Sequence, residues 1–242
     1  MMTFFSRTIL NIAASIFIAG SASAQSESDF IAAFSGDWYV FDSSVRTGQD
    51  ICGLNLSGKK AGENQLLTTK GCTAPLSEAN QWAISEGRII ISKDATQMAV
   101  LGGSQFRVTG DMANSKKSIV IERAQGDGNS AKIAAALRKH TCYFLGFTQK
   151  CAVAEDLKVP ETSGETKENE IEVLVTLIAR AQPRRDASAV GNIAQGTTVK
   201  INQCLTASDG PWCSAVIGET IIWLGMTAVR LNEWPILTFR AL

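Results

Sequence analysis

The 242-residue sequence has little histidine and no excess of charge of either sign. It contains a single histidine, and its 23 basic residues balance its 23 acidic residues. One histidine cannot build a histidine-based metal site. Proteins that bind nucleic acid or an anionic membrane need a clustered basic face, which nothing in this composition favours. We therefore expect neither of these partners.

Motifs of catalysis are also missing. The sequence contains no G-x-S-x-G nucleophile motif and no glycine-rich phosphate loop, and no pair of carboxylates stands out. It has no C-x-x-C spacing, which makes a zinc site a weak alternative for its six cysteines. We predict that the protein is not an enzyme and that it holds no cofactor and no metal.

The apolar run near the start, Ile9 to Ala19, is shorter than the roughly 20 residues that a membrane-spanning helix needs. Arg7 precedes this run and Ala22-Ser23-Ala24 follows it, which is the pattern of a secretory signal peptide over residues 1–24. A single-spanning anchor is the alternative. We expect cleavage before Gln25, with Ser23 as the next best start, and a mature protein in a Gram-negative periplasm or outside the cell.

All six cysteines follow the predicted cleavage site and fall in sequential pairs: Cys52 with Cys72, Cys142 with Cys151, and Cys204 with Cys213. Many connectivities are possible. Each pair nevertheless lies within one expected structural unit, which favours local bridges, and an exported chain meets an oxidising compartment where bridges persist. His140 beside Cys142 also suggests a thiol nucleophile, but no third group is identifiable to orient the base. A bridged cysteine is our interpretation.

Between Gly36 and Arg123 the chain reads as a series of short strands. Apolar residues alternate in runs such as Trp38/Val40 and Cys52/Leu54/Leu56, which is typical of strands with one buried face. Turn-rich segments separate these runs. The pattern predicts a meandering antiparallel sheet, and closure into a barrel would remove its edges. We interpret Trp38 and Trp82 as core residues, with a small apolar ligand inside the barrel as the alternative.

The same stretch resembles the alkaline proteinase inhibitor family, the small periplasmic inhibitors of secreted serralysin-type zinc proteases. The matching features are G-x-W at Gly36, C-x-L-x-L at Cys52 with Gly71-Cys72, then Trp82, G-x-I-x-I at Gly87 and A-x-L at Ala99. The resemblance covers residues 29–124 and implies an eight-stranded, lipocalin-like barrel over 36–124 with one disulfide. It also implies that a mobile N-terminal trunk, residues 25–35, enters the cleft of a secreted zinc protease.

The trunk residues that the resemblance assigns to protease contact are Gln25, Ser26, Glu27, Ser28 and Asp29. A free α-amine at Gln25, with an ordinary pKa of about 8, could ligate zinc through its neutral fraction. Gln25 can instead cyclise to pyroglutamate, and Glu27 and Asp29 stand where apolar residues are expected in a trunk. The alternative is a mobile start followed by a short helix, capped by Ser28 or Asp29, that packs on the barrel mouth.

The pattern changes after the barrel. Residues 125–154 predict a connector that contains a helix over Ala131 to Lys139 and the Cys142–Cys151 pair. Residues 155–170 are acidic with almost nothing apolar, which predicts a solvated linker and the best domain boundary.

Residues 171–242 contain a second resemblance, to a bacterial SH3 domain over residues 171–231, followed by a C-terminal tail. The family's L-N-V-R-S-G-P is matched by Leu177 to Pro183, its G-x-L-x-x-G-x-x-V by Gly191, Gly196 and Val199, its W-x-K-V by Trp212 and Val216, and its ending by Trp223 and Leu231. The resemblance implies a small barrel with an aromatic-lined groove for cell-wall peptides or proteins. Groove candidates are Arg180, Trp212 and Trp223, although Trp212 is more readily a core residue.

Two hypotheses of function follow for this mainly β protein with two barrels, which we expect to be a monomer. The first is a periplasmic inhibitor whose trunk blocks the active-site cleft of a secreted zinc protease. The second is a cell-envelope adaptor that recognises peptidoglycan or a protein through the SH3-like domain, with the first barrel as a scaffold. A weaker third option is a barrel that carries a small apolar ligand.

Overall fold

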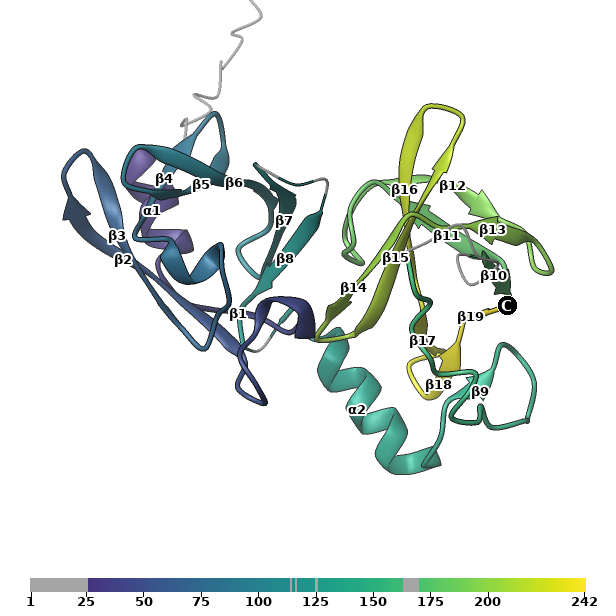
Figure 1. Ribbon diagram of the computed structural model, residues 1–242. Helices are drawn as coiled ribbons and strands as arrows, with labels where there is room; N and C mark the ends of the chain where they lie inside the picture. The colour runs from purple at the N-terminus through teal and green to yellow at the C-terminus, as the bar shows by residue number, and fades with distance from the viewer. Residues whose placement is uncertain (1–25, 114, 116, 125, 163–169) are drawn as a thin grey trace, which may run out of the picture.

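Two β units lie side by side in the computed structural model, which describes residues 26–113, 115, 117–124, 126–162 and 170–242 (Figure 1). The predicted signal peptide and Gln25 lie outside the described residues. The fold is mainly β, as predicted, with the two α-helices α1 (Glu27–Phe34) and α2 (Asn129–His140). Neither helix is long and apolar enough to cross a membrane, and the described chain has no other candidate span.

The first unit is a closed barrel of antiparallel strands, each hydrogen-bonded to the next in sequence. Its eight strands are β1 (Gly36–Val40), β2 (Cys52–Ala61), β3 (Asn64–Lys70), β4 (Gln81–Ser85), β5 (Arg88–Lys93), β6 (Thr96–Gly103), β7 (Arg107–Met112) and β8 (Ser118–Glu122). Strand β1 pairs with β2 along its length and with β8 through Tyr39 and Glu122, which closes the cylinder. The antiparallel sheet predicted from the alternating pattern is therefore confirmed, and so is the closed eight-stranded barrel that the resemblance implied.

Two tryptophans fill the barrel core. Trp38 and Trp82 are fully buried, and each indole N–H has a backbone acceptor. Trp38 Nε1 donates to the Phe34 carbonyl at 2.8 Å, and Trp82 Nε1 donates to the Ser57 carbonyl at 2.9 Å. Because a buried indole without an acceptor would be costly, these bonds let the barrel bury both large side chains.

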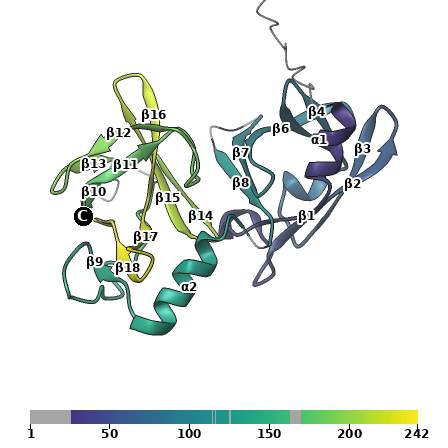
Figure 2. The ribbon, with the colours of Figure 1, turned by 180° about the vertical axis from the view of Figure 1, so that it is seen from behind.

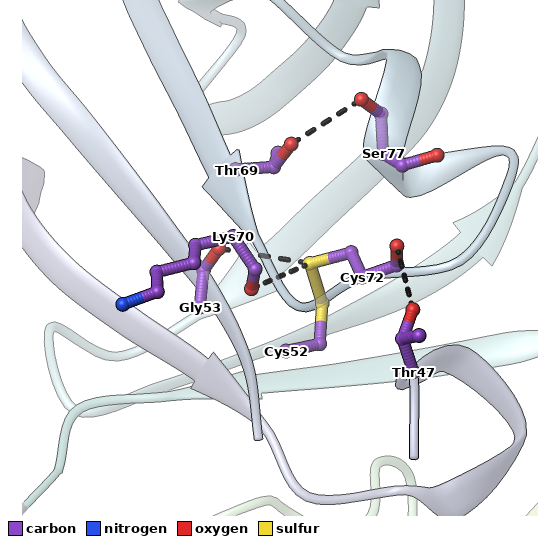
Figure 3. The surroundings of a disulfide bond; sticks show 7 residues. All are labelled: Thr47, Cys52, Gly53, Thr69, Lys70, Cys72 and Ser77. Carbon is purple, nitrogen blue, oxygen red and sulfur yellow. Dashed lines mark hydrogen bonds between the residues drawn. A yellow bond between two sulfur atoms is a disulfide. The ribbon is translucent and has the colours of Figure 1, made fainter. Parts of the chain in front are cut away.

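All three local disulfides predicted from the sequence form, and every cysteine is bridged. Figure 3 shows Cys52 at the start of β2 joined to Cys72 just after β3, where Thr47 Oγ1 donates to the Cys72 carbonyl at 3.3 Å. The Cys72 sulfur also lies 3.6 Å from the carbonyl oxygens of Gly53 and Lys70. A disulfide sulfur has no hydrogen to donate, so we regard these two as packing contacts. The bridge at Cys142 removes the thiol-nucleophile alternative.

The second unit consists of three small sheets, with the strand orders β13-β10-β19, β12-β11-β16-β15-β14 and β17-β18-β9. Its strands are β9 (Phe144–Leu145), β10 (Glu170–Val173), β11 (Leu177–Arg180), β12 (Ala189–Ile193), β13 (Thr198–Lys200), β14 (Gln203–Ala207), β15 (Gly210–Ile217), β16 (Thr220–Gly225), β17 (Thr227–Arg230), β18 (Trp234–Leu237) and β19 (Phe239–Ala241). The tail after Leu231 thus contributes two strands, of which β19 pairs with β10.

The connector over 125–154 belongs structurally to the second unit. Helix α2 packs against β17 and β18, and β9 pairs in parallel with β18, as the view from behind also shows (Figure 2). The helix begins at Asn129, two residues before the predicted start. The described beginning of the linker is not fully solvated, because Pro160 is buried and the Asp156 carboxylate accepts from Arg240 at 3.2 Å. Residues 163–169 of the linker lie outside the described residues.

A close approach between the neighbouring barrel strands β6 and β7 yields the first prediction. A Cβ atom at Gly110 in β7 would lie 1.9 Å from the Val100 carbonyl oxygen in β6. We expect Gly110→Ala to force these strands apart and to lower the free energy of unfolding by about 3 kcal/mol, measured by urea titration. Gly102→Ala in β6 is the matched control, because a Cβ there meets nothing within 4 Å. Equal losses in the two variants would contradict this account.

Candidate functional sites

Helix α1 carries the residues that the sequence assigned to a protease-contacting trunk. Ser26 caps the helix, earlier than the predicted caps Ser28 and Asp29: the Asp29 backbone N–H donates to Ser26 Oγ at 3.3 Å, and the Ser26 N–H donates to Asp29 Oδ2 at 3.0 Å. This reciprocal arrangement satisfies two backbone donors at the helix start. The Ser26 hydrogen bonds lower the pKa of the Asp29 carboxyl from its ordinary 3.8.

The predicted mobile trunk is therefore helical over most of its length. We call Ser26–Asp29 the N-terminal turn of α1. All four of its residues are exposed, but the Asp29 carboxylate is engaged in the cap, which leaves Glu27 as the exposed carboxylate of the turn without a hydrogen bond to another described residue. Of the five predicted contact residues, Gln25 lies outside the described residues.

Arg123, just after β8, fastens α1 to one end of the barrel. Its guanidinium donates to the carbonyls of Ala33 at 3.0 Å and Ser35 at 2.8 Å, and its Cζ atom lies 4.3 Å from the centre of the Trp38 ring. Burial lowers the pKa of Arg123 below its ordinary value. Sequence reasoning missed this contact, because an arginine at a strand end looks like any solvated charge.

The opposite end of the barrel holds an apolar cavity of about 370 Å³. It lies where β8 begins and β7 ends, whereas α1 precedes the start of β1. Its apolar lining comes from the loops and strand ends and consists of Val45, Ala74, Pro75, Leu76, Met98, Met112 and Ile119. A small apolar ligand fits this lining. Neither Trp38 nor Trp82 lines the cavity, so quenching of their fluorescence is not a suitable readout for such a ligand.

A buried ion cluster joins the barrel to the second unit. Arg107 of β7 contacts two carboxylates through Nη2, at 2.8 Å from Glu122 of β8 and at 2.8 Å from Asp209 in the β14–β15 turn. Arg185 Nε donates to the second oxygen of Asp209 at 2.9 Å. The first three side chains are almost entirely shielded from solvent, and Arg185 is a quarter exposed.

Further hydrogen bonds reach these four charges, while Arg107 Nε is buried without a partner among the described residues. The Ser208 N–H donates to Glu122 Oε2 at 3.1 Å, Trp212 Nε1 donates to Asp209 Oδ1 at 3.0 Å, and Arg107 Nη1 donates to the Pro183 carbonyl at 3.1 Å. Because two arginines face two carboxylates, the cluster is neutral overall. Buried charges persist in a folded protein when they are paired and hydrogen-bonded in this way.

The pKa values of the two carboxyls in the cluster are shifted in opposite directions. Burial raises the pKa of Glu122 above its ordinary 4.5, and the shared Arg107 only partly offsets that effect. Burial would also raise the pKa of Asp209, but Arg185 and Arg107 together bring it below its ordinary 3.8. The difference arises because Asp209 faces two arginines whereas Glu122 faces one.

The three groove residues predicted in the second unit are neighbours, since Arg180 pairs with Trp223 across β11 and β16, but only Arg180 is partly exposed. Trp212 and Trp223 are both buried and pack with Val120 of the first barrel, together with Leu205 and Ala207. The first barrel therefore covers much of this aromatic cluster. Trp223 also lines a hollow of about 210 Å³ against barrel residues such as Thr109.

Arg180 and Trp212 do share a groove of about 260 Å³ on the side of the second unit that β11 and β17 form. Trp212 contributes only a buried edge, with Arg185 stacked over its ring at 4.8 Å. The rest of the lining includes Phe147, Leu177, Ile178, Val229 and Arg230, which the sequence did not single out.

Neither a metal centre nor a family assignment emerges beside these sites. Within the described ranges, no three His, Cys, Asp or Glu side chains gather in a way that could hold a metal ion. No protein-family model matches the chain, and no curated protein matches it either.

The ion cluster predicts two pH dependences of opposite sign. Because the folded pKa of Glu122 is raised, its contribution to stability is present below pH 4.5 and is lost as the pH rises through the folded value. Because the folded pKa of Asp209 is lowered, its contribution is present above pH 3.8 and is lost as the pH falls through the folded value.

As the pH rises above 4.5, we expect wild type to lose free energy of unfolding relative to Glu122→Gln, because the variant has no carboxyl to deprotonate. The difference in free energy of unfolding between wild type and Asp209→Asn should instead shrink as the pH falls below about 4. Urea unfolding at a series of pH values measures both. If the difference in free energy of unfolding between wild type and variant changed with pH in the same direction for both variants, the assignment of one arginine to Glu122 and two to Asp209 would be contradicted.

Proposed function

We propose that this protein is an exported, non-enzymatic inhibitor of a secreted zinc metalloprotease, which it contacts with the barrel end that carries α1. The observation that carries the proposal is the closed eight-stranded barrel with α1 clamped across one end. The resemblance of residues 29–124 to the alkaline proteinase inhibitors leads to the same expectation, inhibition of a secreted zinc protease. Three disulfides suit a protein that works in the periplasm or outside the cell.

Obstruction of a cleft requires a rigid support and a projecting end. The barrel supplies the support, since Arg123 and the Trp38–Phe34 hydrogen bond hold the last turn of α1. The N-terminal turn of α1 supplies the projection, because Ser26–Asp29 are all exposed. A carboxylate is an accepted zinc ligand, and Glu27 is the exposed carboxylate here that the helix cap does not engage. In this proposal the protein blocks access and performs no chemistry of its own.

Reversal of one charge on the N-terminal turn tests the proposal. We expect Glu27→Lys in the mature chain to weaken inhibition of a serralysin-type protease about tenfold, since a cation replaces the carboxylate that we propose as the zinc-facing group. The readout is residual hydrolysis of a peptide substrate at increasing inhibitor concentration. Asp50→Lys is the matched control, an exposed residue at the barrel end away from α1. No inhibition by the unaltered protein, or equal inhibition by both variants, would contradict the proposal.

A second function is favoured by the groove between β11 and β17. The second unit resembles a bacterial SH3 domain, and we propose that its groove makes the protein a cell-envelope adaptor with the first barrel as scaffold. Arg180 is the predicted groove residue that remains partly exposed there, whereas both tryptophans are buried. Peptidoglycan and an envelope protein are the two candidate ligands.

Retention on envelope fragments tests the adaptor function. We expect the full mature chain to sediment with purified envelope and Arg230→Glu to reduce the retained fraction about tenfold, because the exposed Arg230 lines the groove. Arg88→Glu, an exposed residue of the first barrel, should leave retention unchanged. Absence of retention, or equal loss in both variants, would contradict a role for the groove.

A further inference from the structure

The groove of the second unit lies between two strands with incomplete pairing. Strand β17 is at the edge of its three-stranded sheet, with β18 on one side and, among the described residues, no strand on the other. Strand β11 pairs with β12 along its length but meets β16 at a single residue pair, Arg180 with Trp223. Residues 175–178 and 228–230 line the groove between them. Strand edges of this kind offer main-chain hydrogen bonds to an extended peptide.

The charge of the groove is positive. Arg180, Arg185 and Arg230 line it, and no carboxylate does. Arg185 is neutralised by Asp209 at 2.9 Å, but Arg180 and Arg230 form no ion pair with any described residue. Burial, followed by repulsion from Arg185, lowers the pKa of Arg180 below its ordinary value. Arg180 is thus a partly buried cation whose charge its surroundings do not fully compensate.

The groove also presents apolar surface beside these cations. Ile178 is 48 % exposed and, two positions before Arg180 on β11, shares its face of the strand. Phe147 is 59 % exposed and lies under the Arg230 guanidinium at 4.6 Å. An extended ligand with a carboxylate over Arg180 would therefore place its side chain two residues away over Ile178.

From these observations we infer that the groove binds an extended acidic segment of a protein partner by strand addition between β11 and β17. Acidic side chains pair with Arg180 and Arg230, and apolar side chains at alternate positions cover Ile178 and Phe147. The inference deepens the adaptor function, because it names the ligand class of that same groove. The edge position of β17 favours polypeptide over glycan, since the backbone groups of an edge strand match those of another strand.

Calorimetric titration of the full mature chain with a short blocked peptide of alternating glutamate and valine tests the inference. We expect the peptide to bind about tenfold more tightly than the same peptide with glutamine for glutamate, because charge-assisted hydrogen bonds are lost in the latter. Arg180→Gln and Arg230→Gln should each weaken binding of the acidic peptide about tenfold. Arg88→Gln, outside the groove, should leave it unchanged.

Two further ligands separate this inference from its alternatives. A peptide of the same sequence with methylated backbone nitrogens should lose binding, because it cannot pair with a strand edge. A soluble peptidoglycan fragment should bind no better than the glutamine peptide. Binding of that fragment without binding of the acidic peptide would overturn the inference and leave the adaptor function standing.

Failure of all ligands to bind would overturn both the inference and the role of the groove as an adaptor site. Equal affinity for the glutamate and glutamine peptides, or for the methylated and unmethylated peptides, would overturn the inference alone. Because Arg230 is exposed, its variant stays informative even if Arg180→Gln, which loses a hydrogen bond to the Ala187 carbonyl, fails to fold.

Discussion

The buried contact of Arg107 with Glu122 and Asp209 determines how the two β units sit together. Each ion in it lies where water does not compensate its charge, so rotation of one unit would leave a partner unpaired in a poorly polarisable interior. Apolar contact reinforces the constraint, because Val120 of the barrel packs with Trp212 and Trp223. The pair of units therefore behaves as a single support for the surfaces at its two ends.

The surfaces that a partner could reach lie away from this contact between the two units. Trp212 and Trp223 are buried, with Val120 of the barrel in their cluster, and the groove between β11 and β17 remains open. At the other end of the molecule, Arg123 fastens the last turn of α1 to the barrel, and the N-terminal turn stays exposed. The proposed inhibitor and adaptor functions would use different ends and can be tested independently.

The ion cluster around Arg107 and the helix cap at Ser26 could not be predicted from the sequence alone. Arg107 and Glu122 stand directly opposite each other on β7 and β8, so that an opposite-charge pair could be recognised once those strands are aligned. Their third partner, Asp209, is about a hundred residues away and belongs to a turn of the second unit. The cap at Ser26 was missed for a local reason: Asp29 serves as the reciprocal acceptor inside the helix, whereas its residue type suggested that it was the cap itself.

The sequence alone determined the barrel strands, the buried tryptophans and the three local disulfides. These follow from alternation of apolar residues and from cysteines close in the chain, both of which act over short distances along it. Only the tertiary structure decided that the connector joins the second unit, that the predicted groove tryptophans face the barrel, and that Arg180 and Arg230 line a groove together. The physical reason is that burial of a charge or an aromatic ring depends on partners from distant strands, which no local pattern specifies.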